Sequence, residues 1–140
     1  MLTKERYDFS CWVIKYDRVS IRGRSYRKDS LKSGDGMVVP LIWNHQHVDP
    51  SWVLGQALLE NREEGVYAYF ALYDTPCKGT VVQMLQDRGS VSTSPFMTQV
   101  QVCGDYITKG VIREVSLTPA RIDPDECYYP VMKQDADQIK

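Results

Sequence analysis

The chain has 140 residues, with 17 lysines and arginines against 18 aspartates and glutamates, and a formal net charge of −1. This near balance argues against a nucleic-acid or anionic-membrane partner. The apolar stretches are well short of the roughly 18 residues of a membrane span, and the N-terminal residues lead into no signal-like hydrophobic segment. We therefore expect one domain over residues 1–131 and a polar tail over 132–140, located in the cytosol where the protein is made.

The four cysteines are too scattered to indicate a metal site or a disulfide framework. Cys11, Cys77, Cys103 and Cys127 lie far apart, and no Cys-x-x-Cys pair occurs. Reduced thiols are the expected state, and no cofactor is implied.

Alternating apolar residues and turn residues predict a mainly β chain. In chain order we expect strands over 7–16 and 19–21, one or two helical turns over 26–32, a buried strand over 38–43, a hairpin of strands 52–60 and 66–73, a helix over 76–88, and a second hairpin of strands 90–102 and 106–117. This order favours a small, closed or nearly closed antiparallel β-barrel with one or two flanking helices. We expect Ile42, Val53, Val66 and Phe70 in its core.

His45 stands at the exit of the predicted buried strand over 38–43. A side chain at a strand end is held by the sheet yet faces a loop region, and imidazole exchanges protons near neutral pH. His45 is therefore a candidate general base, and a strand-capping role is the alternative.

Two further stretches carry groups that complement a histidine base. Alternation places Ser90, Ser92 and Ser94 on one face of a strand, with Val91 and Thr93 on the other. Glu114 lies in the apolar run 111–117, where a buried carboxylate needs a partner or a raised pKa. A nucleophile, a base and an orienting carboxylate are thus present, although a solvated serine face and an ion pair of Glu114 with Arg113 or Lys109 explain the same residues.

The order of these blocks resembles the prohead maturation proteases of tailed phages, relatives of the herpesvirus assemblins. The resemblance covers residues 7–124, and its specific parts are Trp43-Asn44-His45 with Gly55 downstream and the block 113–120, Arg-Glu-Val-Ser-Leu-Thr-Pro-Ala. It implies an assemblin-like β-barrel in the domain 1–131. It also implies a serine endopeptidase that acts on scaffold or major capsid protein inside the assembling procapsid, in the host bacterial cytoplasm.

The resemblance also implies roles for three residues. By position His45 is the base, Ser92 the nucleophile and Glu114 the third member. The sequence departs from the family pattern after Ser92, where Thr93, Ser94 and Pro95 replace an apolar residue, Gly and an aromatic residue, so Ser94 is a rival nucleophile. Arg88, Arg113 and backbone amides near the serines are candidates for the oxyanion hole.

Two other functions compete with a serine protease. The departure after Ser92 admits an inactive relative that serves as a capsid decoration or scaffold-binding protein. A metal-dependent hydrolase using His45 and His47 is the other rival, but these are the chain's only histidines, too few strong ligands for a catalytic zinc. The sequence leaves open whether the chain forms a homodimer.

Overall fold

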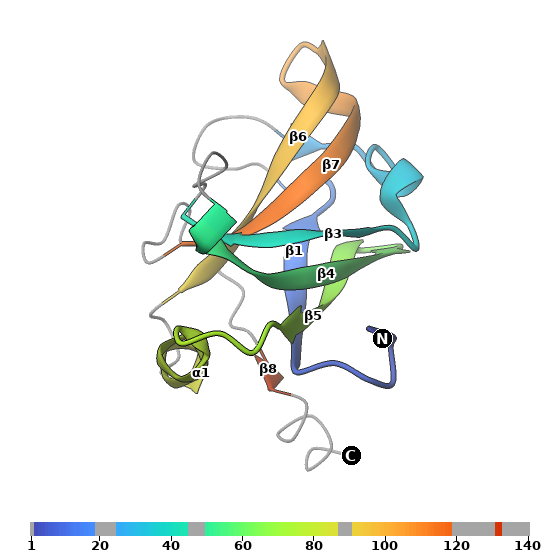
Figure 1. The fold of residues 1–140 in the computed structure, drawn as a ribbon. Helices are drawn as coiled ribbons and strands as arrows, with labels where there is room; N and C mark the ends of the chain where they lie inside the picture. Colours follow the sequence, from blue (N-terminus) through green and yellow to red (C-terminus); the bar gives the residue numbers. More distant parts are fainter. Residues whose placement is uncertain (1, 19–24, 45–49, 87–90, 119–130, 133–140) are drawn as a thin grey trace.

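The computed structural model describes residues 2–18, 25–44, 50–86, 91–118 and 131–132. These residues form a mainly β structure with one α-helix (Figure 1). The strands are β1 Phe9–Lys15, β2 Ser25–Tyr26, β3 Val38–Trp43, β4 Val53–Arg62, β5 Gly65–Leu72, β6 Ser92–Cys103, β7 Tyr106–Thr118 and β8 Val131–Met132, and the helix is α1 Lys78–Gln86. Short 3-10 turns occupy Lys32–Gly34 and Pro50–Trp52.

All eight strands belong to one sheet, with the order β2-β7-β3-β4-β5-β1-β8 and with β6 paired to β7. Five pairings are antiparallel: β1 with β5 and β8, β3 with β4, β4 with β5, and β6 with β7. Of these, the β4–β5 and β6–β7 hairpins are the pairings that the sequence predicts. Two are parallel, because β2 and β3 both pair with β7. The predicted buried strand, β3, thus lies between β4 and β7.

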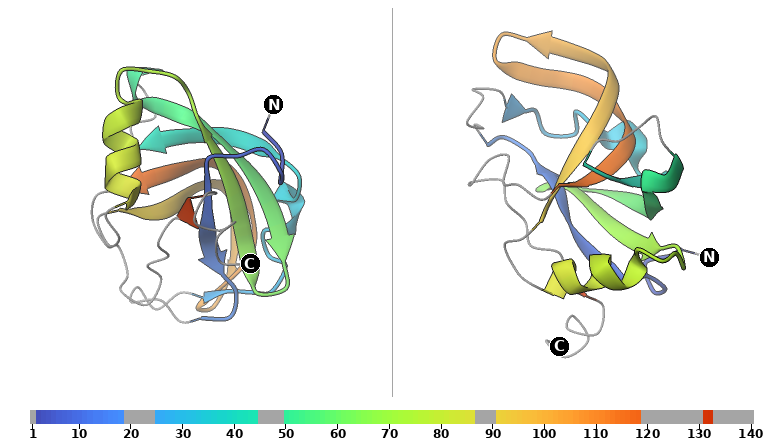
Figure 2. Two further views of the ribbon diagram at one scale, coloured as in Figure 1. Left: turned by 90° about the horizontal axis from the view of Figure 1, so that it is seen from below. Right: turned by 60° about the vertical axis from the view of Figure 1, so that its left-hand side comes forward.

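The sheet curls around one interior but does not close into a barrel. Figure 2 shows the strands curving past one another with α1 along one side, and the β6–β7 hairpin projecting beyond the other strands. No ladder joins β1 to β6 among the described residues. The two strands meet through a side chain instead, because the Thr93 hydroxyl donates to the Trp12 carbonyl at 2.9 Å. The described residues therefore form an open, curled sheet and not the closed barrel that was one of the expected forms.

The core contains side chains from β1, β3, β4, β5, β7 and α1. Phe9 and Phe70 stack at its centre, with ring centroids 4.6 Å apart, and Val66 is buried among them as expected. Val53 is only half-buried, because a bulge makes Leu54 the extra residue opposite β3 and turns Leu54 inward in its place. Alternation alone cannot anticipate this exchange.

The first predicted hairpin is present but has a tighter turn than expected. The ladder of β4 and β5 extends to Arg62 opposite Gly65, so Glu63 and Glu64 alone form the loop. The predicted longer, bulged loop over 61–65 is wrong. Asn61 is held in the strand because its backbone N–H donates to the Asp35 carboxylate at 2.8 Å.

The helical predictions are confirmed in part. Within the predicted helix over 76–88, α1 spans Lys78–Gln86, with Val81 and Leu85 packed on the core, and residues 87–88 lie outside the described residues. The segment 26–32 forms turns and no α-helix: Tyr26 ends β2, and a 3-10 turn begins at Lys32. The predicted strand over 19–21 lies outside the described residues.

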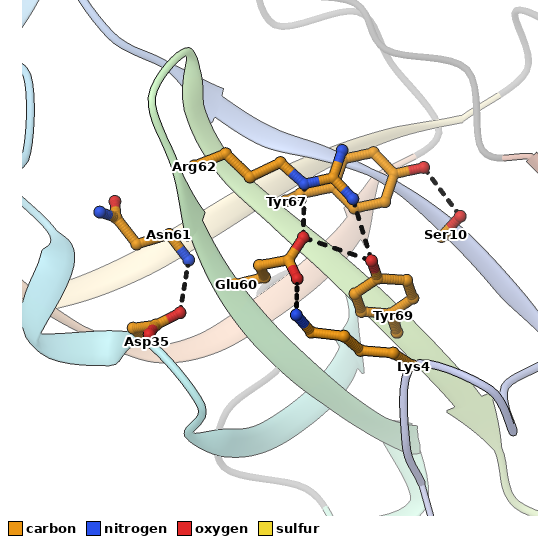
Figure 3. A network of polar contacts seen from close by, with 8 residues as sticks. All are labelled: Lys4, Ser10, Asp35, Glu60, Asn61, Arg62, Tyr67 and Tyr69. Atoms are coloured by element: carbon orange, nitrogen blue, oxygen red, sulfur yellow. Dashed lines mark hydrogen bonds and ion pairs between the residues drawn. The ribbon is translucent and has the colours of Figure 1, made fainter.

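A polar network ties the N-terminal segment to the outer face of β4 and β5 (Figure 3). Lys4 and Arg62 both form ion pairs with Glu60, and Arg62 donates to the Tyr69 hydroxyl at 2.9 Å. The Arg62 guanidinium also lies 3.9 Å from the ring centroid of Tyr67. Although partial burial opposes ionisation, hydrogen bonds from Lys4 and Arg62 hold the Glu60 pKa below its usual range. The charged and polar groups of this network are thus paired with one another.

Among the helices that the structure describes, none combines the length and apolar character needed to cross a membrane.

Candidate functional site

Three strand ends come together at one edge of the fold. Trp43, the last residue of β3, pairs with Leu117 of β7, and the Asn44 backbone N–H donates to the Leu117 carbonyl at 2.7 Å. On the other side of β7, Thr93 pairs with Leu117 and Ser92 with Thr118. The register therefore brings the start of β6, which carries Ser92, to the level of the β3 exit that leads to His45.

Asn44 turns the chain out of β3. Its φ of 46° lies in the left-handed region, which asparagine tolerates better than most residues. His45 follows Asn44 directly in the sequence, but it lies outside the described residues, as do Arg88, Ser90 and His47. The proximity of His45 to Ser92 therefore stays a prediction.

Ser92 is buried, with 4% of its surface exposed, and its hydroxyl is held by the strand opposite. Its Oγ lies 3.0 Å from Oγ1 of Thr118, and the Thr118 hydroxyl also donates to the Ser92 carbonyl at 3.4 Å. Thr118 is 3% exposed. The pair forms a fixed, desolvated hydroxyl group at the edge where β3 ends.

The face predicted for the serines is confirmed for residues 91–94. Val91 packs in the core and Thr93 reaches toward β1, while Ser92 and Ser94 occupy the opposite face. On β7 the same face carries Ser116 opposite Ser94 and Thr118 opposite Ser92. We call Ser92, Ser94, Ser116 and Thr118 the hydroxyl face.

The hydroxyl face opens toward solvent along β6. Ser92 and Ser116 are buried, Ser94 is half-buried, and Phe96 is 40% exposed. This arrangement gives the two rival nucleophiles different surroundings.

Glu114 belongs to the same face but stands further along the ribbon. It pairs with Phe96, four positions from the Ser92–Thr118 pair, or about 13 Å along the strands. Glu114 is half-buried rather than enclosed, and Arg113 beside it is exposed. The expectation of a carboxylate buried in an apolar strand is therefore too strong, because a bulge at Arg113 opens the ladder there.

Arg113 lies far from Ser92 and contacts a different part of β6. Its guanidinium Nε donates to the Thr98 hydroxyl at 2.7 Å, and its backbone lies five positions from Thr118, about 17 Å along β7. As a candidate for the oxyanion hole, Arg113 is therefore too far from Ser92.

Thr118 and Ser116 are the members of the site that sequence reasoning misses. The signal for them is the alternation of Val115 and Leu117 with Ser116 and Thr118, the same period that identifies the serine face of β6. What that pattern cannot give is the register between β6 and β7, which sets Thr118 rather than Ser116 opposite Ser92.

The described residues hold no cluster of three or more metal-ligating side chains. Chemically, the arrangement offers a buried serine hydroxyl, a second hydroxyl that fixes it, and a strand exit beside both.

In comparisons with known proteins, no family model, curated protein or solved structure matches this chain significantly.

Proposed function

We propose that this protein is a serine endopeptidase that cleaves scaffold or capsid precursor proteins during phage procapsid maturation. The observation that carries the proposal is the position of Ser92, whose buried hydroxyl lies where β6 begins, across β7 from the strand exit leading to His45. The strand start that carries Ser92 and the strand exit that precedes His45 are far apart in the sequence but lie on the two sides of β7 at one edge, which supports pairing Ser92 as nucleophile with His45 as base.

The fold expected of an assemblin-like enzyme belongs to this proposal. A nearly closed barrel is supported by the contact of Thr93 with Trp12, which draws the β6 and β1 edges of the curled sheet together. The substrate class and the location inside the procapsid, in the host cytoplasm, rest on the resemblance in the two sequence blocks around His45 and Glu114.

In the proposed mechanism His45 removes the proton of the Ser92 hydroxyl as Oγ attacks the scissile carbonyl carbon. His45 then returns that proton to the leaving amine as the peptide C–N bond breaks, and the acyl group stays on Ser92. Water repeats the sequence and releases the acid. Glu114 orients the imidazole and stabilises its cationic form.

Glu114 is the candidate for orienting His45 because it lies on the same face of the β6–β7 ribbon as Ser92. Glu114 and Ser92 are about 13 Å apart along the strands.

Cleavage of a co-expressed capsid precursor tests the proposal. We expect Ser92→Ala to abolish cleavage, while Ser94→Ala, the matched change one pleat further along the same face, leaves it measurable. Loss of cleavage in Ser94→Ala with full cleavage in Ser92→Ala would move the nucleophile to Ser94. A folded wild-type protein that cleaves no precursor would favour the decoration or scaffold-binding function instead.

A further inference from the structure

Thr118 holds Ser92 through two contacts that reach different atoms of the same residue. Its Oγ1 is 3.0 Å from the Ser92 Oγ and 3.4 Å from the Ser92 carbonyl oxygen. Both residues are buried, so bulk water competes little for these groups. The arrangement ties the serine side chain and its main chain to one hydroxyl.

The Thr118 side chain is conformationally restricted, so its hydroxyl can hold the Ser92 side chain in one orientation. Its β-branched side chain has few rotamers, whereas a serine side chain turns easily among three. The strand around it is paired on both sides, since Leu117 pairs with Thr93 of β6 and with Trp43 of β3. The Thr118 hydroxyl therefore selects one orientation of the Ser92 side chain.

The pair has two hydrogen-bonding arrangements, because each hydroxyl carries one proton and two lone pairs. When Thr118 donates to the Ser92 carbonyl, its oxygen is open to accept the proton of Ser92. When Thr118 turns its proton to the Ser92 Oγ, the proton of Ser92 is released toward another acceptor. In the second arrangement the hydrogen bond from Thr118 directs the Ser92 proton away from Thr118, toward a base.

We propose that Thr118 is a positioning residue for the nucleophile: it fixes the Ser92 Oγ and, by rotating its own proton, directs the Ser92 proton to the base. The proposal rests on the proposed function, since it assigns Thr118 a role in the same reaction. Thr118 contacts the proposed nucleophile, so it acts on the reaction through Ser92.

The test compares rates of fluorophosphonate labelling, per folded molecule, among variants of the full chain. Thr118→Val removes the hydroxyl at nearly constant shape, and we expect it to be labelled about tenfold more slowly than wild type. Thr118→Ala should be equally slow. Thr118→Ser keeps the hydroxyl and should restore the rate to within about twofold.

Thr93→Val is the matched control. Thr93 is the neighbour of Ser92 on β6 and is also buried with a bonded hydroxyl, but it donates to Trp12 on the other face of the sheet. We expect Thr93→Val to lower the melting temperature and leave the labelling rate of the folded protein unchanged. With a peptide substrate, Thr118→Val should lower kcat and leave KM nearly constant.

Wild-type rates in both Thr118→Val and Thr118→Ala would overturn this proposal while leaving the proposed function intact. Equal slowing in Thr93→Val, or no rescue by Thr118→Ser, would also overturn it, because either result indicates a general structural effect. A folded wild-type protein that is not labelled would overturn the proposed function and, with it, the role of Thr118.

Discussion

Glu114 and Ser92 lie on the same face of the β6–β7 ribbon, four positions apart. The proposed role of Glu114 is therefore to orient His45 and not to contact Ser92. If Glu114 orients His45, Glu114→Gln should keep the fold and lower kcat strongly with little effect on KM, since a misoriented imidazole is a poor base. Steady-state kinetics and thermal unfolding of the same samples check this. Lower stability with unchanged activity per folded molecule would reduce Glu114 to a structural role.

Two buried residues make the folded state sensitive to alkaline pH. Burial raises the pKa of the Cys11 thiol and of the Tyr16 phenol to about 12. In the unfolded chain these groups ionise near pH 9 and 10, so between about pH 9 and 12 the folded state binds more protons than the unfolded state. The free energy of unfolding should therefore fall across this range.

Denaturant unfolding at a series of pH values measures this dependence. The stability that the two groups contribute is complete below about pH 8 and is lost progressively as the pH approaches 12. Tyr16→Phe, which has no phenol to ionise, should show a shallower fall. A stability that stays constant to pH 11 in the wild-type protein would contradict the account.

At the scale of elements, hairpins and helices formed by neighbouring residues can be predicted from the sequence, whereas pairings between distant strands cannot. Both hairpins and α1 are specified by neighbouring alternation and turn residues. The parallel pairing of β3 with β7 joins segments more than 70 positions apart and leaves no local signal. That pairing brings the β3 exit to the candidate site. The partner of Ser92, Thr118, is set by the register of the β6–β7 hairpin, which alternation does not fix.

Bulges explain why Val53 and Glu114 are less buried than the sequence pattern predicts. The extra residues Val13, Leu54 and Arg113 each interrupt the two-residue period of a strand. Leu54 thereby takes the core position expected for Val53, and Arg113 marks the point where the ladder beside Glu114 opens. A periodic pattern has no means of locating an insertion of one residue, so these faces could not be assigned in advance.

Gly55 lies in β4, between β3 and β5, where the neighbouring backbone leaves no room for a side chain. It pairs with Leu41 and with Leu72, and a Cβ at this position would overlap the Ala71 carbonyl oxygen and lie 2.9 Å from the Leu72 Cα. We expect Gly55→Ala to lower the free energy of unfolding by about 3 kcal/mol, because backbone must shift to admit the methyl group.

Gly79→Ala is the control for this change. Gly79 lies in α1, and a Cβ there would have no neighbour within 4 Å. The same addition of a methyl group should raise stability by about 0.5 kcal/mol, since alanine favours a helix over glycine. Urea unfolding of both variants gives the comparison, and equal stabilities for Gly55→Ala and wild type would show that the strands relax freely.

For the whole molecule, the curl of the sheet separates the apolar interior from the hydroxyl face at the β3 exit. Its β6 and β1 edges meet at Thr93 and Trp12, and the hydroxyl face lies on the opposite side of β6 from that contact. The interior is apolar, whereas the outer face at the β3 exit carries buried hydroxyls. Buried polar groups need hydrogen-bond partners, so this end is more constrained than an ordinary strand edge.

The most direct test of the central claim is fluorophosphonate labelling of the folded wild-type protein, followed by peptide mass mapping. The account predicts one modified residue, Ser92, with labelling lost on unfolding because the reaction needs the assembled strand ends. A label on Ser94 would contradict the assignment of the nucleophile. An intact fold with no serine labelled would contradict the claim that this protein is a serine protease.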